Sequence, residues 1–588
     1  MAETRPPAPT IIIVGGLSAG PSAAAKARRE NEHARIMLFE KTADISYATC
    51  GIPYALSGVI ASRDKLLVVR PELLQQRFNI EMHLGETVLD IDAPAQEVIT
   101  TRGRYHYDQL VFAAGARAVI PPIAGDDGAS PDTWQQAPNW STVRSLDDFD
   151  RLTPLLTDGR TRRAVVLGGG LIGVETAENL HKRGIAVTVI EGAEQILAQW
   201  SPPFAHFAQT VMTEHGVEVI TGHSAQTIHT ADGRITAVTV TNRAGQQRRL
   251  DTDLLLLSTG IRPNTEMLLR QGAQAMPNGA LIVNDQMQTS LPHIYAAGDC
   301  VALPNPLSGT RSYLPLGTHS NKAGRTTGIN AVGAVTDRYP GGYGTAIVQV
   351  FNFTLARTGL TQRELGDRPV ARSYIHANAT PSYYPDARDM VLEITYEPET
   401  GRLLAAEAFG EHGVDKRIDV LATCLYAGLT VEDLPNLDLA YAPPYSPAKD
   451  PVVVAGYVAG NHRRHQCAPL SPMQFAQALA ASPQSYQLLD VRTASERSCH
   501  GAIAGGLHIE LDQLRDRLHE LDHNRPVYVY CARGTRGYLA ALILKHHGFG
   551  VVRNLAGGFK AWTMQGYPVI AAALQASCAP RSDPAAAA

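Results

Sequence analysis

The sequence is poor in cysteine, in aromatic residues and in long apolar runs. Its 588 residues include seven cysteines, which are too few and too irregularly spaced for a disulfide framework. We therefore expect reduced cysteines and a cytoplasmic protein. The N-terminus has no basic cluster, and the apolar run at residues 11–14 is too short for a signal-peptide core or a membrane span.

Charge of one sign is also lacking. The formal net charge is −4, and charged residues make up 18% of the chain. This balance argues against nucleic acid or an anionic membrane as the main partner. The length predicts about four domains, enough to bury several cores.

The first recognisable pattern is a buried strand at residues 11–14, followed by the glycine-rich residues 15–20 and an alanine-rich helix over 21–29. A second strand over 36–39 ends in Glu40. This order is typical of a Rossmann-type unit, whose turn glycines admit a pyrophosphate and whose acid accepts hydrogen bonds from ribose. Leu17 replaces the middle glycine, so an ordinary glycine-rich strand–helix turn is the alternative.

The pattern recurs intact about 150 residues later. A strand over 164–167 leads into GGGLIG (168–173), and the strand over 186–190 ends in Glu191. Two such units in one chain are far more specific than either alone. The Glu191 carboxylate would accept from a ribose 2′-hydroxyl and repel a 2′-phosphate, and no arginine follows within residues 192–194, which favours NADH while leaving NADPH possible.

Further buried strands are predicted over 107–115, 253–260 and 294–297. Asp299 follows the last of them, where it can bind a ribityl hydroxyl or simply cap a helix. Beyond residue 340 the sequence changes to strands over 346–353 and 390–396 and a helix over 415–427, with no nucleotide motif. This segment reads as an α+β dimerisation domain.

The polar residues 461–469 contain His462, His465 and Cys467. No spaced partner cluster accompanies them, so a linker is favoured over a metal site. A last domain follows, with strands over 487–491 and 527–530 and a helix from about Gly537. Residues 573–588 are rich in Ala and Pro and are expected to be disordered.

Cys50 follows the first nucleotide-binding unit, near the start of a predicted helix. Backbone N–H groups and the helix dipole stabilise a thiolate at such a position. No second cysteine lies five residues on, so Cys50 would cycle through a mixed disulfide, a persulfide or a sulfenic acid. A buried apolar cysteine is the alternative.

Cys531 ends a strand and opens a six-residue loop before a helix. Loop N–H groups can converge on its sulfur, and Arg533 and Arg536 add positive charge. Such a loop stabilises a thiolate or a persulfide anion, although a phosphatase loop has related geometry.

Two resemblances cover nearly the whole chain. Residues 10–456 resemble the coenzyme A-disulfide reductase branch of the pyridine nucleotide-disulfide oxidoreductases, through SYATCGIPY (46–54), GGGLIGVETAENL (168–180), IYAAGD (294–299) and YAPPYSPAKDP (441–451). The C-terminal part resembles a single rhodanese domain, through LLDVRTASE (488–496), CARGTRGYLA (531–540) and NLAGGFKAW (554–562). Together they are similar to the fusion type also described as an NADH-dependent persulfide or polysulfide reductase.

The resemblance implies an α/β fold with two Rossmann-like domains, an α+β dimerisation domain and a C-terminal α/β rhodanese domain. The expected segments are FAD-binding (10–145 and 266–338), NAD(H)-binding (146–265), dimerisation (339–460), linker (461–470), rhodanese (471–572) and tail (573–588). The resemblance also implies a homodimer, with no nucleic acid or membrane partner.

Site residues follow from the same resemblance. Those for FAD are Gly15, Gly20, Glu40, Ala114, Gly115 and Asp299, and those for NADH are Gly168, Gly170, Gly173 and Glu191. Those for coenzyme A are Ser22, Lys26, Arg29, Ser46, Thr49, His319 and Lys449. The catalytic residues are Cys50, Tyr383 and Tyr441, with the tyrosines reaching Cys50 from the partner subunit, and Cys531 and Arg536 in the rhodanese loop. No metal is expected.

The implied activity is NADH-driven reduction of sulfane sulfur through Cys50, with Cys531 carrying sulfur. Three alternatives stay open: a coenzyme A-disulfide reductase with an accessory rhodanese domain, an NADH oxidase or peroxidase that cycles Cys50 as a sulfenic acid, and a non-catalytic flavoprotein redox sensor.

Overall fold

The computed structural model describes residues 8–126, 133–333, 336–464, 469–481 and 485–571. The predicted disordered tail, residues 573–588, lies outside this range. The chain divides into two compact units, Met1–Ala198 with Met212–Tyr343 and Gln199–Val211 with Gly344–Ala588. This division does not separate the predicted FAD- and NADH-binding segments, so their boundaries stay a prediction.

A parallel five-stranded sheet in the first unit carries the first glycine-rich turn. In spatial order its strands are β20 (Ile294–Ala296), β7 (Gln109–Phe112), β1 (Thr10–Val14), β2 (Arg35–Glu40) and β3 (Glu81–Leu84). Ile11, Ile12 and Ile13 are fully buried, as the continuous β-branched run predicts. The glycine-rich turn after β1 and Glu40 at the end of β2 therefore meet at the carboxyl edge of the sheet.

A second parallel sheet in the same unit repeats this plan. Its strands in spatial order are β10 (Trp140–Thr142), β17 (Leu254–Leu257), β11 (Arg163–Leu167), β12 (Ala186–Ile190) and β13 (Glu218–Ile220). All four residues of β17 are buried. The turn after β11 and Glu191, which directly follows β12, occupy the same relative places as the turn after β1 and Glu40. The prediction of two Rossmann-type units is confirmed.

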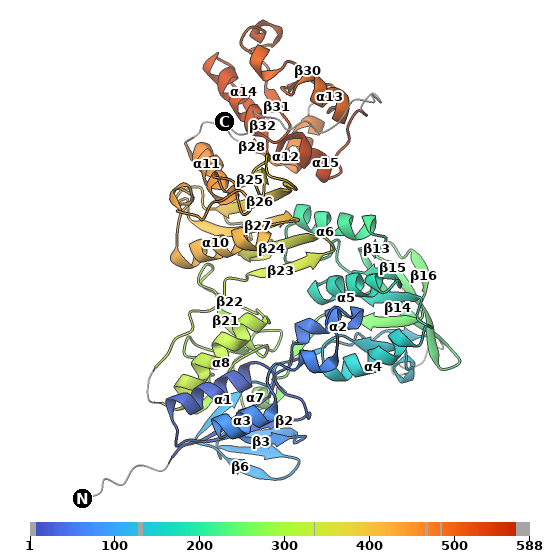
Figure 1. Cartoon of the computed structure of the whole chain (residues 1–588), viewed down its shortest axis with the longest axis vertical. Coiled ribbons are helices and arrows are strands. Elements are labelled where there is room, and N and C mark those ends of the chain that lie inside the picture. The colour runs from blue at the N-terminus through green and yellow to red at the C-terminus, as the bar shows by residue number, and fades with distance from the viewer. Residues whose placement is uncertain (1–7, 127–132, 334–335, 465–468, 482–484, 572–588) are drawn as a thin grey trace, which may run out of the picture. The chain divides into compact units, whose positions relative to one another are not determined.

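Two helices far apart in sequence lie side by side in the first unit, α1 (Ala19–Glu30) and α8 (Gly317–Ala331) (Figure 1). Their backbones meet closely, because a Cβ added at Gly324 would lie 2.4 Å from the carbonyl oxygen of Ala19, and one at Gly328 would lie 2.3 Å from that of Ala23. Only glycine permits this approach. The packing places one face of α8 beside the helix that follows the first glycine-rich turn.

The second unit contains an antiparallel sheet. Its strands in spatial order are β23 (Ala346–Val350), β24 (Phe353–Gly359), β27 (Leu403–Gly410), β26 (Asp389–Tyr396) and β25 (Ala371–Asn378). The prediction of one strand over 346–353 is wrong, since the chain reverses at Phe351, whose φ is +55°. The apolar pattern continues through the turn and hides it. The predicted helix over 415–427 is α10 (Val414–Ala427).

The C-terminal part of this unit is a parallel sheet flanked by helices. Its strands in spatial order are β28 (Pro469–Leu470), β32 (Val552–Leu555), β31 (Val527–Tyr530), β29 (Gln487–Asp490) and β30 (Leu507–His508). The predicted linker is only partly a linker. Its first residues form the last turn of α11 (Pro451–Arg463), where His462 contacts the Tyr396 hydroxyl, and its last residues form β28. His465 and Cys467 lie outside the described residues.

The cysteines differ in exposure. Cys50, Cys300, Cys424 and Cys531 are free, and only Cys50 among these four is exposed. Across the described ranges, no helix is long and apolar enough to cross a bilayer.

Candidate active site

The first glycine-rich turn is shaped for a dinucleotide. Gly15 has a φ of +106°, and a Cβ there would lie 2.2 Å from the carbonyl oxygen of Ala113. Glu40 accepts hydrogen bonds from the backbone N–H of Gly16 (2.8 Å) and of Thr42 (3.0 Å), one on each carboxylate oxygen. Because a carboxylate oxygen has two lone pairs, capacity remains for a ribose hydroxyl. Gly20 packs directly on the Gly15 carbonyl.

The second turn reproduces this geometry. Glu191 accepts from the N–H groups of Gly169 (2.7 Å) and Ala193 (2.8 Å). Gly168 and Gly173 are held by close backbone approaches, whereas a Cβ at Gly170 would meet no heavy atom within 4 Å. This open side lies at the N-terminus of α5 (Leu171–Lys182), where backbone N–H groups favour an anion. These residues fit a bound dinucleotide.

Asp299 is held by partners that the sequence did not indicate. Its carboxylate is 2.8 Å from the Arg144 guanidinium and accepts from the Ser320 hydroxyl at 3.2 Å. Gly115, which is predicted to bind FAD together with Asp299, has a φ of +63°, and a Cβ there would meet no heavy atom within 4 Å. Glu40, Gly115 and Asp299 thus form a sheet-edge site whose residues fit FAD.

Cys50 lies in a short 3₁₀ helix, η1 (Thr49–Gly51), directly before α2 (Ile52–Ser57). The preceding loop is fixed to residues 66–68: Ala48 N–H donates to the Leu66 carbonyl, and Val68 N–H donates to the Ser46 carbonyl, both at 2.8 Å. Ser46 has a φ of +46°, an uncommon value for a non-glycine residue. The exposed sulfur therefore sits on a well-fixed loop, and the alternative of a buried apolar cysteine is wrong.

An acid hydrogen-bonded to a tyrosine flanks α2, and sequence reasoning did not assign it. The Tyr54 hydroxyl donates to Glu175 at 3.0 Å, and Ser57 donates to Asn179 at 2.7 Å, joining α2 to α5. Burial raises the pKa of Glu175, and the nearby charge of Glu178 adds to this. Burial followed by the charge of Glu175 raises the pKa of Tyr54. The hydrogen-bonded pair Tyr54–Glu175 can hold a proton at α2, the helix that directly follows Cys50 and η1.

Several residues predicted to bind coenzyme A gather on α1 and α8. Ser22, Lys26 and Arg29 lie on α1, and the Ser22 hydroxyl accepts from Asn321 of α8 at 2.9 Å. Lys26 forms an ion pair with Glu30. His319 lies near the start of α8, where its Nδ1 is 2.6 Å from the Tyr339 hydroxyl, and burial lowers its pKa to about 4. A neutral imidazole is thus present at pH 7.

Two of the residues predicted in the second unit, Tyr383 and Tyr441, lie together. The hydroxyls of Tyr383 and Tyr441 lie 3.4 Å apart, although the residues are 58 positions apart in sequence. The two residues are 70% and 51% exposed. Lys449 is exposed as well. Two tyrosines predicted to serve one sulfur therefore do lie together.

The Cys531 loop follows β31 as predicted, but the prediction of six loop residues is wrong, because α14 (Thr535–His546) begins at Thr535 and not near Gly537. Arg536 therefore lies in the first turn of α14. The Gly534 N–H donates to the Cys531 sulfur at 3.1 Å. Gly534 has a φ of +109°, which explains the glycine at this position. Cys531 itself is buried, with 1% of its surface exposed.

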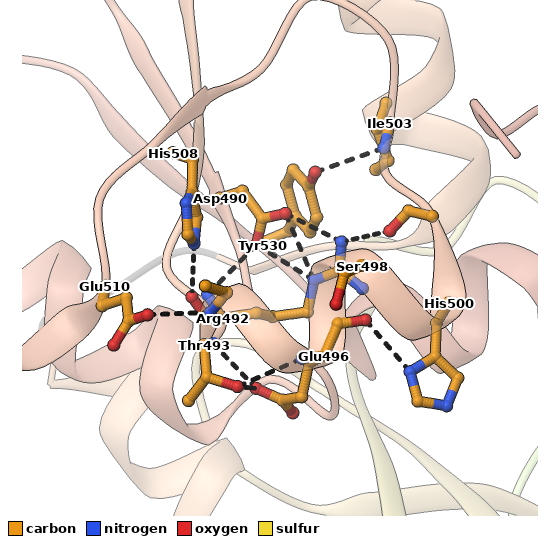
Figure 2. Close-up of polar contacts among 12 residues, drawn as sticks. Asp490, Arg492, Thr493, Glu496, Ser498, His500, Ile503, His508, Glu510 and Tyr530 are labelled. Carbon is orange, nitrogen blue, oxygen red and sulfur yellow. Dashed lines mark hydrogen bonds and ion pairs between the residues drawn. The ribbon is translucent and has the colours of Figure 1, made fainter. Parts of the chain in front are cut away.

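A polar network fixes the neighbouring strand ends, as Figure 2 shows. Asp490 and Arg492 form a buried ion pair at 2.8 Å, and Arg492 also donates to the Gly501 carbonyl. Glu496 closes a capping box with Thr493 at the start of α13 (Ala494–His500). The same carboxylate binds both terminal nitrogens of Arg536, at 2.6 and 2.8 Å. Arg536 is thus paired with Glu496, a partner that the sequence did not predict.

Comparison with known proteins identifies the family. The sequence model described as "Pyridine nucleotide-disulphide oxidoreductase" matches residues 9–326. This chain belongs to that family. Two further models match the pyridine nucleotide-disulphide oxidoreductase dimerisation domain at residues 345–451 and a rhodanese-like domain at residues 471–565. Members of the family use FAD and NAD(P)H, and the two glycine-rich sites fit these ligands.

Three relatives of this oxidoreductase are informative. The NAD(P)H sulfur oxidoreductase (CoA-dependent) of Pyrococcus abyssi is 33% identical over 453 residues, 76% of this chain and 98% of its own. The structure described as reduced Bacillus anthracis CoADR-RHD is 34% identical, with a TM-score of 0.88 over 95% of this chain and 98% of its own. The NAD-dependent persulfide reductase from A. fulgidus is 31% identical, with a TM-score of 0.84 over 94% and 100%. The predicted architecture is confirmed.

Proposed function

We propose that this oxidoreductase uses NADH to reduce the sulfane sulfur of persulfides and polysulfides, coenzyme A persulfide foremost, through Cys50. The observation that carries the proposal is the exposure of Cys50, since the other free cysteine described in the first unit, Cys300, is buried. The names of the relatives from Pyrococcus abyssi and A. fulgidus support a sulfur substrate and a role for coenzyme A.

The Cys50 step can be written with its electrons balanced. The thiolate attacks the inner sulfur of coenzyme A persulfide, forms a Cys50–coenzyme A disulfide and releases hydrosulfide with the bonding electron pair. Low leaving-group pKa speeds this kind of exchange, and hydrosulfide is a good leaving group. When bound, NADH and FAD together supply the two electrons that cleave the mixed disulfide to two thiolates.

The remaining residues bind and position. FAD would be held by Gly15, Gly20, Glu40, Ala114, Gly115 and Asp299, and NADH by Gly168, Gly170, Gly173 and Glu191. Coenzyme A would lie along Ser22, Lys26, Arg29, Ser46, Thr49 and His319, with Lys449. The exposed pair Tyr383 and Tyr441 would donate to the leaving thiolate at the Cys50 of a partner subunit in a homodimer, since a phenol can supply a proton there.

Cys531 is proposed to carry sulfur as a persulfide, stabilised by the Gly534 N–H in its loop. Arg536 would act by fixing α14 through Glu496. The proposal includes a cytoplasmic setting without a nucleic acid or membrane partner, which the charge balance favours.

One comparison tests the proposed substrate. We expect kcat/KM for NADH oxidation to be at least about tenfold higher with coenzyme A persulfide than with coenzyme A disulfide, because hydrosulfide leaves more readily than a coenzyme A thiolate. Both substrates would be assayed under anaerobic conditions with the same enzyme preparation. Equal values, or a preference for the disulfide, would instead favour a coenzyme A-disulfide reductase with an accessory rhodanese domain.

A further inference from the structure

Asp389, the first residue of β26, forms ion pairs with positively charged side chains of the C-terminal domain of the same unit. One carboxylate oxygen is 2.9 Å from the Arg533 guanidinium, and the other binds Lys560 and lies 3.2 Å from the ring nitrogen Nε2 of His376. Arg533 also donates to the Asn378 side chain at 2.6 Å. One residue of the antiparallel sheet of the second unit, Asp389, therefore forms ion pairs with two cationic side chains of the rhodanese-like domain.

Both cations flank the sulfur-carrying loop. Arg533 is the second residue after Cys531. Lys560 is in α15 (Gly558–Met564), whose first turn lies against the loop: Phe559 N–H donates to the Cys531 carbonyl at 2.7 Å, and Lys560 N–H donates to the Ala532 carbonyl at 3.0 Å. A change at Asp389 therefore alters the electrostatic field at the loop without removing a group of the loop itself.

The carboxylate is fully ionised. Burial acts to raise the pKa of Asp389, but His376, Arg533 and Lys560 together lower it well below its usual range. Burial lowers the pKa of His376, so Arg533 and Lys560 are the permanent cations at this carboxylate. Asp389 thus cancels one of the two positive charges that Arg533 and Lys560 bring to the loop.

Arg536, in the first turn of α14, is paired as well, because it binds Glu496 through two nitrogens. Both guanidiniums near Cys531 in the sequence are therefore paired with carboxylates. Arg533, Lys560 and Arg536 thus bring three positive charges against the two negative charges of Asp389 and Glu496. Each added negative charge on an anionic sulfur donor therefore gains less than it would if Asp389 were uncharged.

We propose that Asp389 is a specificity-determining residue for the sulfur donor of Cys531. By holding Arg533, it disfavours dianionic donors such as thiosulfate relative to donors of lower charge. The inference rests on the proposed role of Cys531 as a sulfur carrier. The contact lies across two domains and 144 positions of sequence, so one domain sets the donor preference of the other.

The chemistry under test is a sulfur transfer in two steps. The Cys531 thiolate attacks the outer sulfur of thiosulfate, forms a Cys531 persulfide anion and releases sulfite with the electron pair of the broken S–S bond. Cyanide then takes the outer sulfur as thiocyanate and restores the thiolate. Benzenethiosulfonate reacts in the same way with release of benzenesulfinate, but it carries one negative charge instead of two.

The experiment measures kcat/KM for thiocyanate formation with both donors at low ionic strength. We expect Asp389→Asn to raise the ratio of thiosulfate to benzenethiosulfonate at least about fivefold, because the released charge acts more strongly on the dianion. Adding Arg533→Gln to Asp389→Asn is expected to bring the ratio back to within about twofold of the wild-type value. Asp389→Ser, which also lacks the charge, is the second variant should Asp389→Asn fold poorly.

Lys560→Gln is the matched control, since it removes one contact to Asp389 while Arg533 stays paired. Lys560→Gln should not raise the ratio. A rise equal to that of Asp389→Asn would show that loosening the contact between the two domains, and not loss of the Asp389 charge, changes the donor preference. That result would overturn the inference. An unchanged ratio in both Asp389 variants would overturn it as well and leave the sulfur-carrier role intact. Absence of Cys531-dependent thiocyanate in the wild type would instead overturn the sulfur-carrier role, and the inference with it.

Discussion

Replacing Cys50 by serine is expected to lower NADH-driven reduction of coenzyme A persulfide at least about a thousandfold. A serine hydroxyl is a far weaker nucleophile than a thiolate and cannot form the mixed disulfide. Cys300 cannot substitute, because it is fully buried and burial raises the pKa of its thiol to about 12. The measurement is anaerobic NADH oxidation with coenzyme A persulfide as acceptor.

The variant should keep its flavin, since Cys50 is not among the residues that shape the dinucleotide sites around Glu40 and Glu191. Flavin absorbance of the purified Cys50→Ser protein is therefore the control for folding. Sulfur transfer to cyanide at Cys531 should also persist. Substantial persulfide reduction by a flavin-loaded Cys50→Ser protein would contradict the assignment of Cys50 as the redox-active cysteine.

The reciprocal change, Cys531→Ser, should remove sulfur transfer from thiosulfate or polysulfide to cyanide by at least about a thousandfold. The reason is that Cys531 is the cysteine of this loop and its sulfur accepts a hydrogen bond from the Gly534 N–H. Turnover of coenzyme A persulfide added directly is expected to change little, because that substrate reaches Cys50 without a carrier. The two activities would be measured on one preparation.

The two serine variants serve as controls for each other, because each should lose one activity and keep the other. If Cys531→Ser lost both activities while remaining folded and flavin-loaded, coenzyme A persulfide would have to pass through the rhodanese loop. If it kept thiocyanate formation, another sulfur would have to be the carrier, and the reading of the loop would be wrong.

Local patterns predicted much of the fold. The strands over 186–190 and 527–530 occur with the predicted bounds, since each is a short apolar run that ends at a clear signal. Predictions were wrong where the local sequence pattern gave no sign of a chain reversal or of a helix extended by tertiary packing. The alternation over 346–353 continues through the reversal at Phe351, and the polar residues 461–463 extend α11 because the preceding turns of that helix are packed.

The candidate site was less predictable than the fold. The glycines and acids of both dinucleotide motifs lie within about 25 residues of one another, so spacing alone identified them. The pairs Tyr54–Glu175 and Arg533–Asp389 join residues 121 and 144 positions apart. A charged side chain in a loop has many potential partners, and only the packing of whole domains selects one. The sequence indicated two arginines beside Cys531, whereas the structure shows that each is paired with a carboxylate.

The central claim is that Cys50 relays electrons to sulfur through a disulfide with coenzyme A. The most direct test is the intact mass of the undigested protein after incubation with coenzyme A persulfide in the absence of NADH. We expect the mass of one coenzyme A per chain to be added, located at Cys50 by digestion, removed by NADH and absent in Cys50→Ser. An unmodified protein, or an adduct that persists in Cys50→Ser, would contradict the account.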